Sequence, residues 1–146
     1  MLAAEIEGII KLLIATVFGM LIGLERESKR KPAGVRTYAL VCLGSCLFTI
    51  ASVGFSGAAD PSRVAAGIVT GVGFLGGGAI FGSGTKRRGI TTATSIWVVA
   101  AIGIAVGIGE YVLASFATLA SLLLLYSSRI LKFFVERSRK GKTNKF

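Results

Sequence analysis

The chain has 146 residues, of which 53% are hydrophobic and only 16% are charged, and its formal net charge is +10. A soluble domain usually has about a quarter charged residues, so this composition excludes an ordinary soluble globular fold. It also argues against a nucleic-acid-binding protein, because the basic residues are bunched between long apolar segments and form no basic face on a soluble domain.

Five apolar segments follow one another along the chain. A hydrocarbon core of about 30 Å needs about 20 helical residues, and each segment approaches that length. The predicted transmembrane helices are Ile6–Leu24, Tyr38–Phe55, Val64–Phe81, Ile90–Gly107 and Tyr111–Ser128. We therefore predict an all-α, polytopic membrane protein with a five-helix transmembrane domain, residues 1–128, and a basic tail, residues 129–146.

The first segment opens without the basic region of a signal peptide. Residues Met1–Glu7 contain two acids and no base, so we expect this segment to remain as a helix.

Small residues recur at helical spacing in the first and third segments. In lipid, helices associate through close backbone contact, which glycine permits. The residues predicted to pack helices, within one chain or across a dimer, are Gly19, Gly23, Gly67, Gly71, Gly73 and Gly77, with Trp97 packed against the third helix. The run Gly76-Gly77-Gly78 weakens a helix by about 1 kcal/mol per residue, and we expect a break or kink there.

Polar residues gather at the ends of the first, second and fourth segments that adjoin basic loops. They are Glu25, Arg26, Arg36, Thr37, Thr91 and Thr92. One interpretation is a structural collar, with Arg36 bridging to Glu25 and the two threonine hydroxyls of the fourth segment capping its helix. The other is a ligand pocket, in which arginine and a helix amino terminus favour an anion such as phosphate, whereas Glu25 and Glu27 favour a divalent cation such as Mg²⁺. The sequence leaves both open and assigns no cofactor.

The basic residues predict the orientation of the chain. All of them except Lys11 and Arg63 fall in the loop after the first segment, the loop after the third, or the tail. Cytoplasmic loops are enriched in Lys and Arg, so we expect the amino terminus outside the cytoplasm and the carboxyl terminus inside.

No catalytic pattern is evident. The chain has no histidine, its two cysteines do not complete a zinc site, and no nucleophile–base pair stands out. We expect a non-enzymatic protein.

Three ordered stretches resemble the signatures of the MgtC/SapB family of membrane proteins. They are Gly23–Glu27 with Lys31–Thr37, then Gly71–Ile80, then Gly89–Ala93 followed by Trp97 and Gly107–Tyr111. The resemblance implies a bacterial inner-membrane protein with five helices and an outside amino terminus, linked to adaptation to low magnesium. It also implies that some members act by binding other membrane proteins, including the F-type ATP synthase. Many members have a soluble domain after the fifth helix, whereas 18 residues follow Ser128 in this sequence, so the resemblance leaves open whether functions of that domain apply.

Two functions therefore remain open. We favour a regulatory or binding protein that works through helix–helix contacts, with a homodimer or another inner-membrane protein as partner. The alternative is a transporter or channel for magnesium or phosphate. A dedicated magnesium path should place carboxylates inside the membrane, and here each acid lies at a helix end or in a loop.

Overall fold

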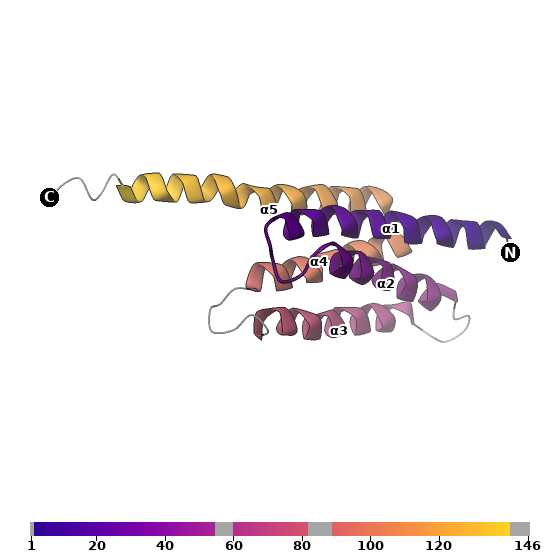
Figure 1. The fold of residues 1–146 in the computed structure, drawn as a ribbon. Helices are drawn as coiled ribbons and strands as arrows, with labels where there is room; N and C mark the ends of the chain where they lie inside the picture. The colour runs from indigo at the N-terminus through magenta and orange to yellow at the C-terminus, as the bar shows by residue number, and fades with distance from the viewer. Residues whose placement is uncertain (1, 55–59, 82–88, 141–146) are drawn as a thin grey trace.

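The computed structural model describes residues 2–54, 60–81 and 89–140, with side chains described as far as Ser127. All regular elements within these ranges are α-helices (Figure 1). They are α1 (Leu2–Ser28), α2 (Val35–Gly54), α3 (Pro61–Phe81), α4 (Ile90–Gly107) and α5 (Tyr111–Lys140). The predicted all-α fold is confirmed, and the bounds of α4 are those expected from the sequence.

Four of these helices are long and apolar enough to cross a membrane, namely α1, α2, α3 and α4. The apolar part of α5, Tyr111–Ser127, is shorter than the others. The backbone of α5 nevertheless continues as one helix to Lys140, so the predicted fifth span and the first part of the predicted tail form a single rod. The orientation of the two termini across a membrane stays a prediction.

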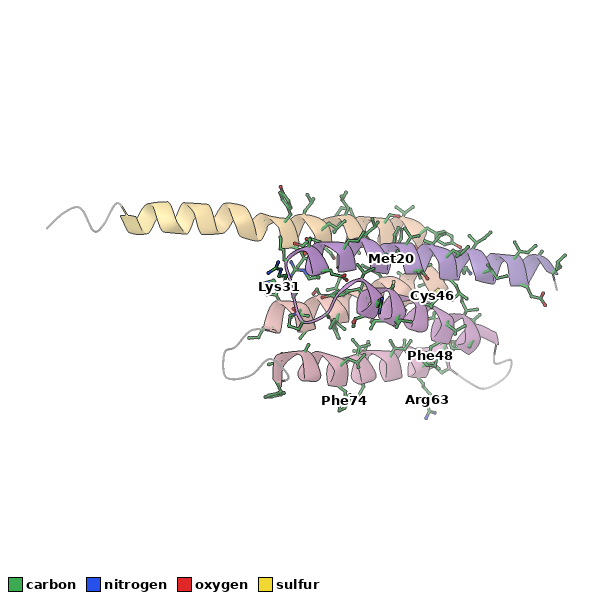
Figure 2. The ribbon with its side chains drawn as sticks, in the orientation of Figure 1. Met20, Lys31, Cys46, Phe48, Arg63 and Phe74 are labelled. Carbon is green, nitrogen blue, oxygen red and sulfur yellow. The ribbon has the colours of Figure 1, made fainter. Side chains whose placement is uncertain are left out.

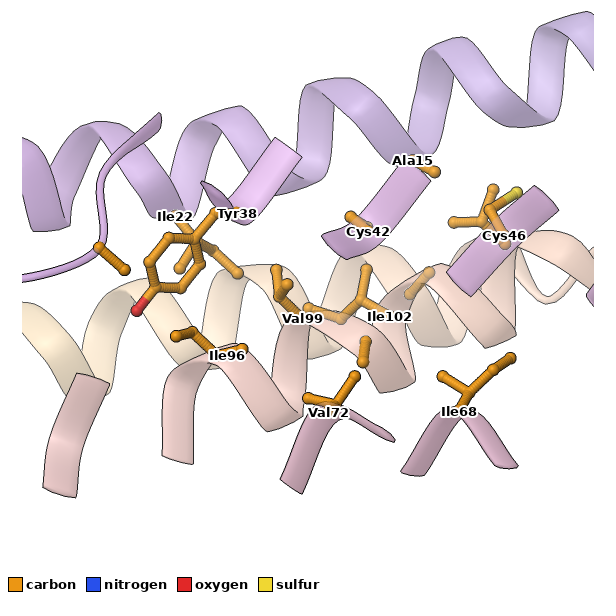
Figure 3. Packing of buried hydrophobic residues seen from close by; sticks show 14 of the residues in the cluster. Ala15, Ile22, Tyr38, Cys42, Cys46, Ile68, Val72, Ile96, Val99 and Ile102 are labelled. Carbon is orange, nitrogen blue, oxygen red and sulfur yellow. The ribbon is translucent and has the colours of Figure 1, made fainter. Parts of the chain in front are cut away.

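Helix α4 lies at the centre of the bundle and packs against each of the other four helices. Its apolar side chains fill the space between neighbours on opposite sides, and Val99 lies between Ile22 of α1 and Val72 of α3 (Figure 3). Half of the α4 span is buried, compared with 11% of the α3 span. The bundle is therefore tight around α4 and loose at α3.

Glycines of α1 bring its backbone directly onto α2. A Cβ atom added to Gly19 would lie 2.6 Å from the carbonyl oxygen of Tyr38, and one added to Gly23 would lie 2.6 Å from Cα of Val35. Real Cβ atoms essentially never come closer than 3.0 Å to another heavy atom. The close contact between these helices therefore requires glycine at both positions, as expected for small-xxx-small packing in lipid.

The other side of α2 meets a second pair of glycines, on α4. A Cβ atom on Gly103 would lie 2.3 Å from the carbonyl oxygen of Cys42, and one on Gly107 would lie 2.6 Å from Cβ of Thr49. Cys42 also faces Gly19, whose added Cβ would come within 2.9 Å of the Cys42 Cβ. Helix α2 is thus clamped between glycine faces of α1 and α4.

The start of α3 is fixed by local chemistry. Asp60 precedes Pro61, and its carboxylate accepts hydrogen bonds from the backbone N–H of Ser62 at 2.9 Å and from the Ser62 hydroxyl at 2.7 Å. This is the usual N-cap arrangement, with proline at the first helical position. The same hydrogen bonds lower the pKa of Asp60.

The predicted break at Gly76-Gly77-Gly78 is wrong, because α3 is one uninterrupted helix through this run. Intrinsic propensity disfavours glycine by about 1 kcal/mol per residue. A helix in lipid has no water to satisfy a broken backbone, however, and each unsatisfied group costs several kcal/mol. The second effect is larger, so the helix persists.

Helices α1 and α4 end in the same way. After α1, the N–H of Lys31 bonds to the carbonyl of Arg26 at 3.1 Å, and Arg30 adopts a positive φ of 51°. After α4, the equivalent positive-φ position is Gly109, with φ 92°. This is the Schellman motif, which usually has glycine at that position, so Arg30 is the strained version of the turn that Gly109 makes without strain.

Candidate functional site

The structure divides the residues of the predicted polar cluster into a buried group and an exposed group. The buried members are Arg26 and Thr92, both 2% exposed, with Glu25 partly buried beside them. The exposed members are Arg36, Thr37 and Thr91.

Arg26 and Glu25 form the charged centre of the buried group. Nε of Arg26 donates to Oε2 of Glu25, and Nζ of Lys29 pairs with Oε1 of the same carboxylate. Lys29 also donates to the carbonyl oxygen of Leu125 at 3.2 Å and lies 5.7 Å from the ring centroid of Tyr126. Two cations thus share one carboxylate, and the end of α1 is tied to α5.

Tyr38 connects this charged centre to the first turns of α4. Its hydroxyl is 2.6 Å from Oγ of Ser95 and donates to the carbonyl oxygen of Thr92 at 3.3 Å. The side chain is fully buried, and both Arg26 and Glu25 lie within electrostatic range of it. Tyr38 and Ser95 were not predicted as site residues, although each is a polar residue one helical turn or less from a predicted one.

Two predicted contacts of the structural collar are wrong. Glu25 pairs with Arg26 and Lys29 and not with Arg36, because these two cations sit beside it on the same helix end. The N-cap of α4 is Gly89, and no side-chain hydrogen bond caps it. A Cβ atom on Gly89 would lie 2.3 Å from the carbonyl oxygen of Ala79, so the approach of α3 to α4 excludes the usual capping residues there.

Glu27 has a structural partner. Its Oε2 accepts a hydrogen bond from the N–H of Val35 at 2.8 Å and so caps the start of α2. A Cβ atom on Gly34 would lie 2.5 Å from the same oxygen, so glycine makes room for this cap. The described residues contain no group of three or more His, Cys, Asp or Glu side chains that could hold a metal ion.

The packing residues divide in a similar way. Gly19 and Gly23 contact α2, whereas Gly67, Gly71, Gly73 and Gly77 have no atom within 4 Å of an added Cβ. Trp97, expected against α3, leaves 51% of its surface exposed.

One side of α3 has small residues at which no other helix packs closely. At helical spacing they are Ala66, Thr70, Gly73 and Gly77, which are turned away from the buried Ile68, Val72 and Gly76 and lie beside the exposed Phe74. Three of the four are exposed, and Gly77 is partly buried. We call this set the outward face of α3.

Comparisons with known proteins place the chain among membrane proteins of one kind. The model of the MgtC family matches residues 12–134. The chain is 44% identical over 127 residues to a protein of Escherichia coli K12 with the printed name "Putative magnesium transporter YhiD", covering 82% of this chain and 59% of that protein. It is 41% identical over 122 residues to the protein MgtC of Brucella abortus strain 2308, covering 84% of this chain and 50% of the relative.

A third relative is the protein MgtC of Salmonella typhimurium strain 14028s, with 43% identity over 111 residues, covering 76% of this chain and 48% of the relative. The chain therefore spans about half to three fifths of the length of these relatives. No solved structure matches.

Proposed function

Since the chain belongs to the MgtC family, we propose that it is a non-enzymatic protein of the bacterial inner membrane that acts by binding another membrane protein, or a second copy of itself, and that it serves adaptation to low magnesium. The magnesium link is supported by the family and by the name of the Escherichia coli relative. The inner-membrane location is supported by the four apolar helices and by the basic loops, which the sequence predicts on one side of the membrane.

The observation that carries the binding role is the outward face of α3. Small residues in membrane helices normally allow a neighbouring backbone to approach, as Gly19 and Gly103 do within this chain. On the outward face, Gly73 has open space where a Cβ would lie. A helix of a partner can therefore approach α3 there, in the way that α1 and α4 approach α2.

A transport role is the second candidate, and the buried charged centre favours an anion over a cation. Arg26 and Lys29 already neutralise the Glu25 carboxylate, and their positive charges disfavour a second cation such as Mg²⁺ beside it. Among the described residues, Arg26 makes its only hydrogen bond through Nε. Its two terminal nitrogens are therefore free to donate to an oxyanion such as phosphate.

The binding role is tested by Gly73→Leu, with Gly8→Leu as the matched control because Gly8 also has no atom within 4 Å of an added Cβ. We expect the Gly73→Leu variant to insert into the membrane and melt like the native protein. Cells that carry it should no longer grow at low magnesium, and energy transfer between differently labelled copies, or between the protein and its partner, should be lost. Gly8→Leu should keep both. If Gly73→Leu supports normal growth, the outward face is not the binding surface.

The transport role is tested by flux of magnesium, and separately of phosphate, into proteoliposomes. Flux that is abolished by Arg26→Gln or by Arg36→Ala, in protein verified as folded, would establish a transporter and locate its path. We expect no flux of either ion from the native protein.

A further inference from the structure

An apolar groove of about 570 Å³ lies between α2 and α3. Its α2 side includes Leu40, Gly44 and Phe48, and its α3 side includes Gly67, Gly71 and Leu75. Figure 2 shows Phe48 between the two helices, whereas Phe74 and Arg63 point away from α2. Gly71 of the groove and Gly73 of the outward face are two residues apart on one helix, so the groove and the outward face are different sides of α3.

Glycines create this space. An added Cβ on Gly44, Gly67 or Gly71 would meet no atom within 4 Å, so the hollow is where side chains are missing from both walls. Leu40 and Phe48 remain 64% and 62% exposed at its rim. The groove is therefore open to the surroundings.

The groove is elongated and apolar, as a site for a hydrocarbon chain must be. Its α2 wall, from Leu40 to Phe48, is about 12 Å long and its α3 wall, from Val64 to Leu75, about 16 Å, at about 1.5 Å per residue. A hydrocarbon chain lying along this length would contact apolar side chains and glycine backbone on both walls.

A cation lies one helical turn beyond the groove's lining, at the start of α2. Arg36 is one turn before Leu40 on the same side of α2, and Thr37 is one turn before Val41, which also lines the groove. Arg36 is exposed and forms no hydrogen bond or ion pair with any described residue. Arg63, near the other end, points away from α2 (Figure 2). The groove therefore has a positive charge at the Arg36 end, which is the end predicted to face the cytoplasm.

We propose that the α2–α3 groove binds one acyl chain of an anionic glycerophospholipid, with its phosphate held by Arg36. The chain fills the hollow left by the three glycines, and the guanidinium makes charge-assisted hydrogen bonds to the phosphate oxygens. The anionic character of the headgroup is selected because Arg36 has no carboxylate partner to neutralise it among the described residues.

The test is native mass spectrometry of the purified full-length protein. The protein is mixed in detergent with phosphatidylglycerol, or with phosphatidylcholine that has acyl chains of the same length, and the lipid that stays bound after the detergent is removed is measured. We expect retention of one phosphatidylglycerol per chain, in preference to phosphatidylcholine. Arg36→Gln should reduce that preference about tenfold, which is the loss expected when a hydrogen-bonded charge is removed. Gly71→Leu should abolish retention of either lipid by filling the groove.

Arg63→Gln is the matched charge control and Gly8→Leu the matched glycine control, and both should bind phosphatidylglycerol like the native chain. Equal losses in Arg36→Gln and Arg63→Gln would mean that lipid is attracted by net charge only, which overturns the proposal. Retention that survives Gly71→Leu would place the lipid elsewhere. If a second copy of the protein occupies the groove, the native protein should form dimers with either lipid, and Gly71→Leu should dissociate them. This result would also overturn the proposal. Melting curves of each variant confirm that lost binding is not lost folding.

Discussion

Helices α2 and α3 are similar in length and apolar character, but they differ in how many glycines they contain and in how tightly they are packed. α3 has six glycines and α2 has two, yet α2 is the clamped helix and α3 the loosely held one. The glycines that clamp α2 belong to its neighbours α1 and α4. What decides close packing is therefore which side a glycine faces and not how many glycines a helix contains.

The largest effect should come from breaking the charged centre on the tight side of the bundle. Arg26→Gln removes the buried partner of Glu25 and should lower the free energy of unfolding by about 3 kcal/mol or more. Arg36→Gln, on the groove side, should change it by less than about 0.5 kcal/mol. The stability of both variants is measured by heating them in detergent and recording the fraction of protein that stays monodisperse. Similar losses in the two variants would contradict the division into a buried and an exposed group.

Glycine-to-alanine changes test the comparison directly. Gly103→Ala places a Cβ against the backbone of α2 and should destabilise the protein by about 1–3 kcal/mol. Gly71→Ala meets open space and should be neutral or stabilising by up to about 1 kcal/mol, because alanine is the better helix former. The melting temperature of Gly103→Ala should fall, whereas that of Gly71→Ala should rise slightly or stay unchanged.

A smaller loss is expected where a hydrogen bond joins the tight helices. Tyr38→Phe removes the hydroxyl that contacts Ser95 and Thr92 and should cost about 1 kcal/mol. Tyr126→Phe is the control, since Tyr126 is 56% exposed. Equal melting curves for the two variants would show that the Tyr38 hydroxyl adds nothing to the packing of α2 on α4.

The smallest effect is a gain. Arg30→Gly relieves a positive φ that L side chains disfavour by about 1 kcal/mol, so the variant should melt slightly higher than the native protein. A lower melting temperature would mean that the Arg30 side chain contributes more than its backbone strain costs.

The sequence was sufficient for the helices themselves, because apolar runs between basic loops specify spans directly; the bounds of α4 agree to the residue. It was not sufficient for the packing roles of the glycines. Gly19 and Gly73 have the same spacing to a second glycine, and only the rotation of each helix in the bundle separates them. That rotation depends on contacts between segments distant in the chain.

The same limit applies to the polar cluster. Arg36 and Arg26 both adjoin the predicted inner end, but Arg26 turns into the bundle while Arg36 stays outside it. The expected pairing of Arg36 with Glu25 failed because Lys29, one turn after Glu25, completes the pairing from the same helix. The position of each polar residue along its helix was therefore predictable, and its position around the helix was not.

Helix α5 is one unbroken helix that extends beyond the rest of the bundle (Figure 1). Its 30 residues extend for about 45 Å, well beyond a hydrocarbon core of about 30 Å, and Figure 1 shows its far end projecting past the other helices. Lys29 donates a hydrogen bond to the carbonyl oxygen of Leu125 on α5. From Leu125, 15 residues, or about 22 Å of helix, lead to Lys140. If α5 tilted about its contact with Lys29, Lys140 would therefore move much further than the residues next to Leu125.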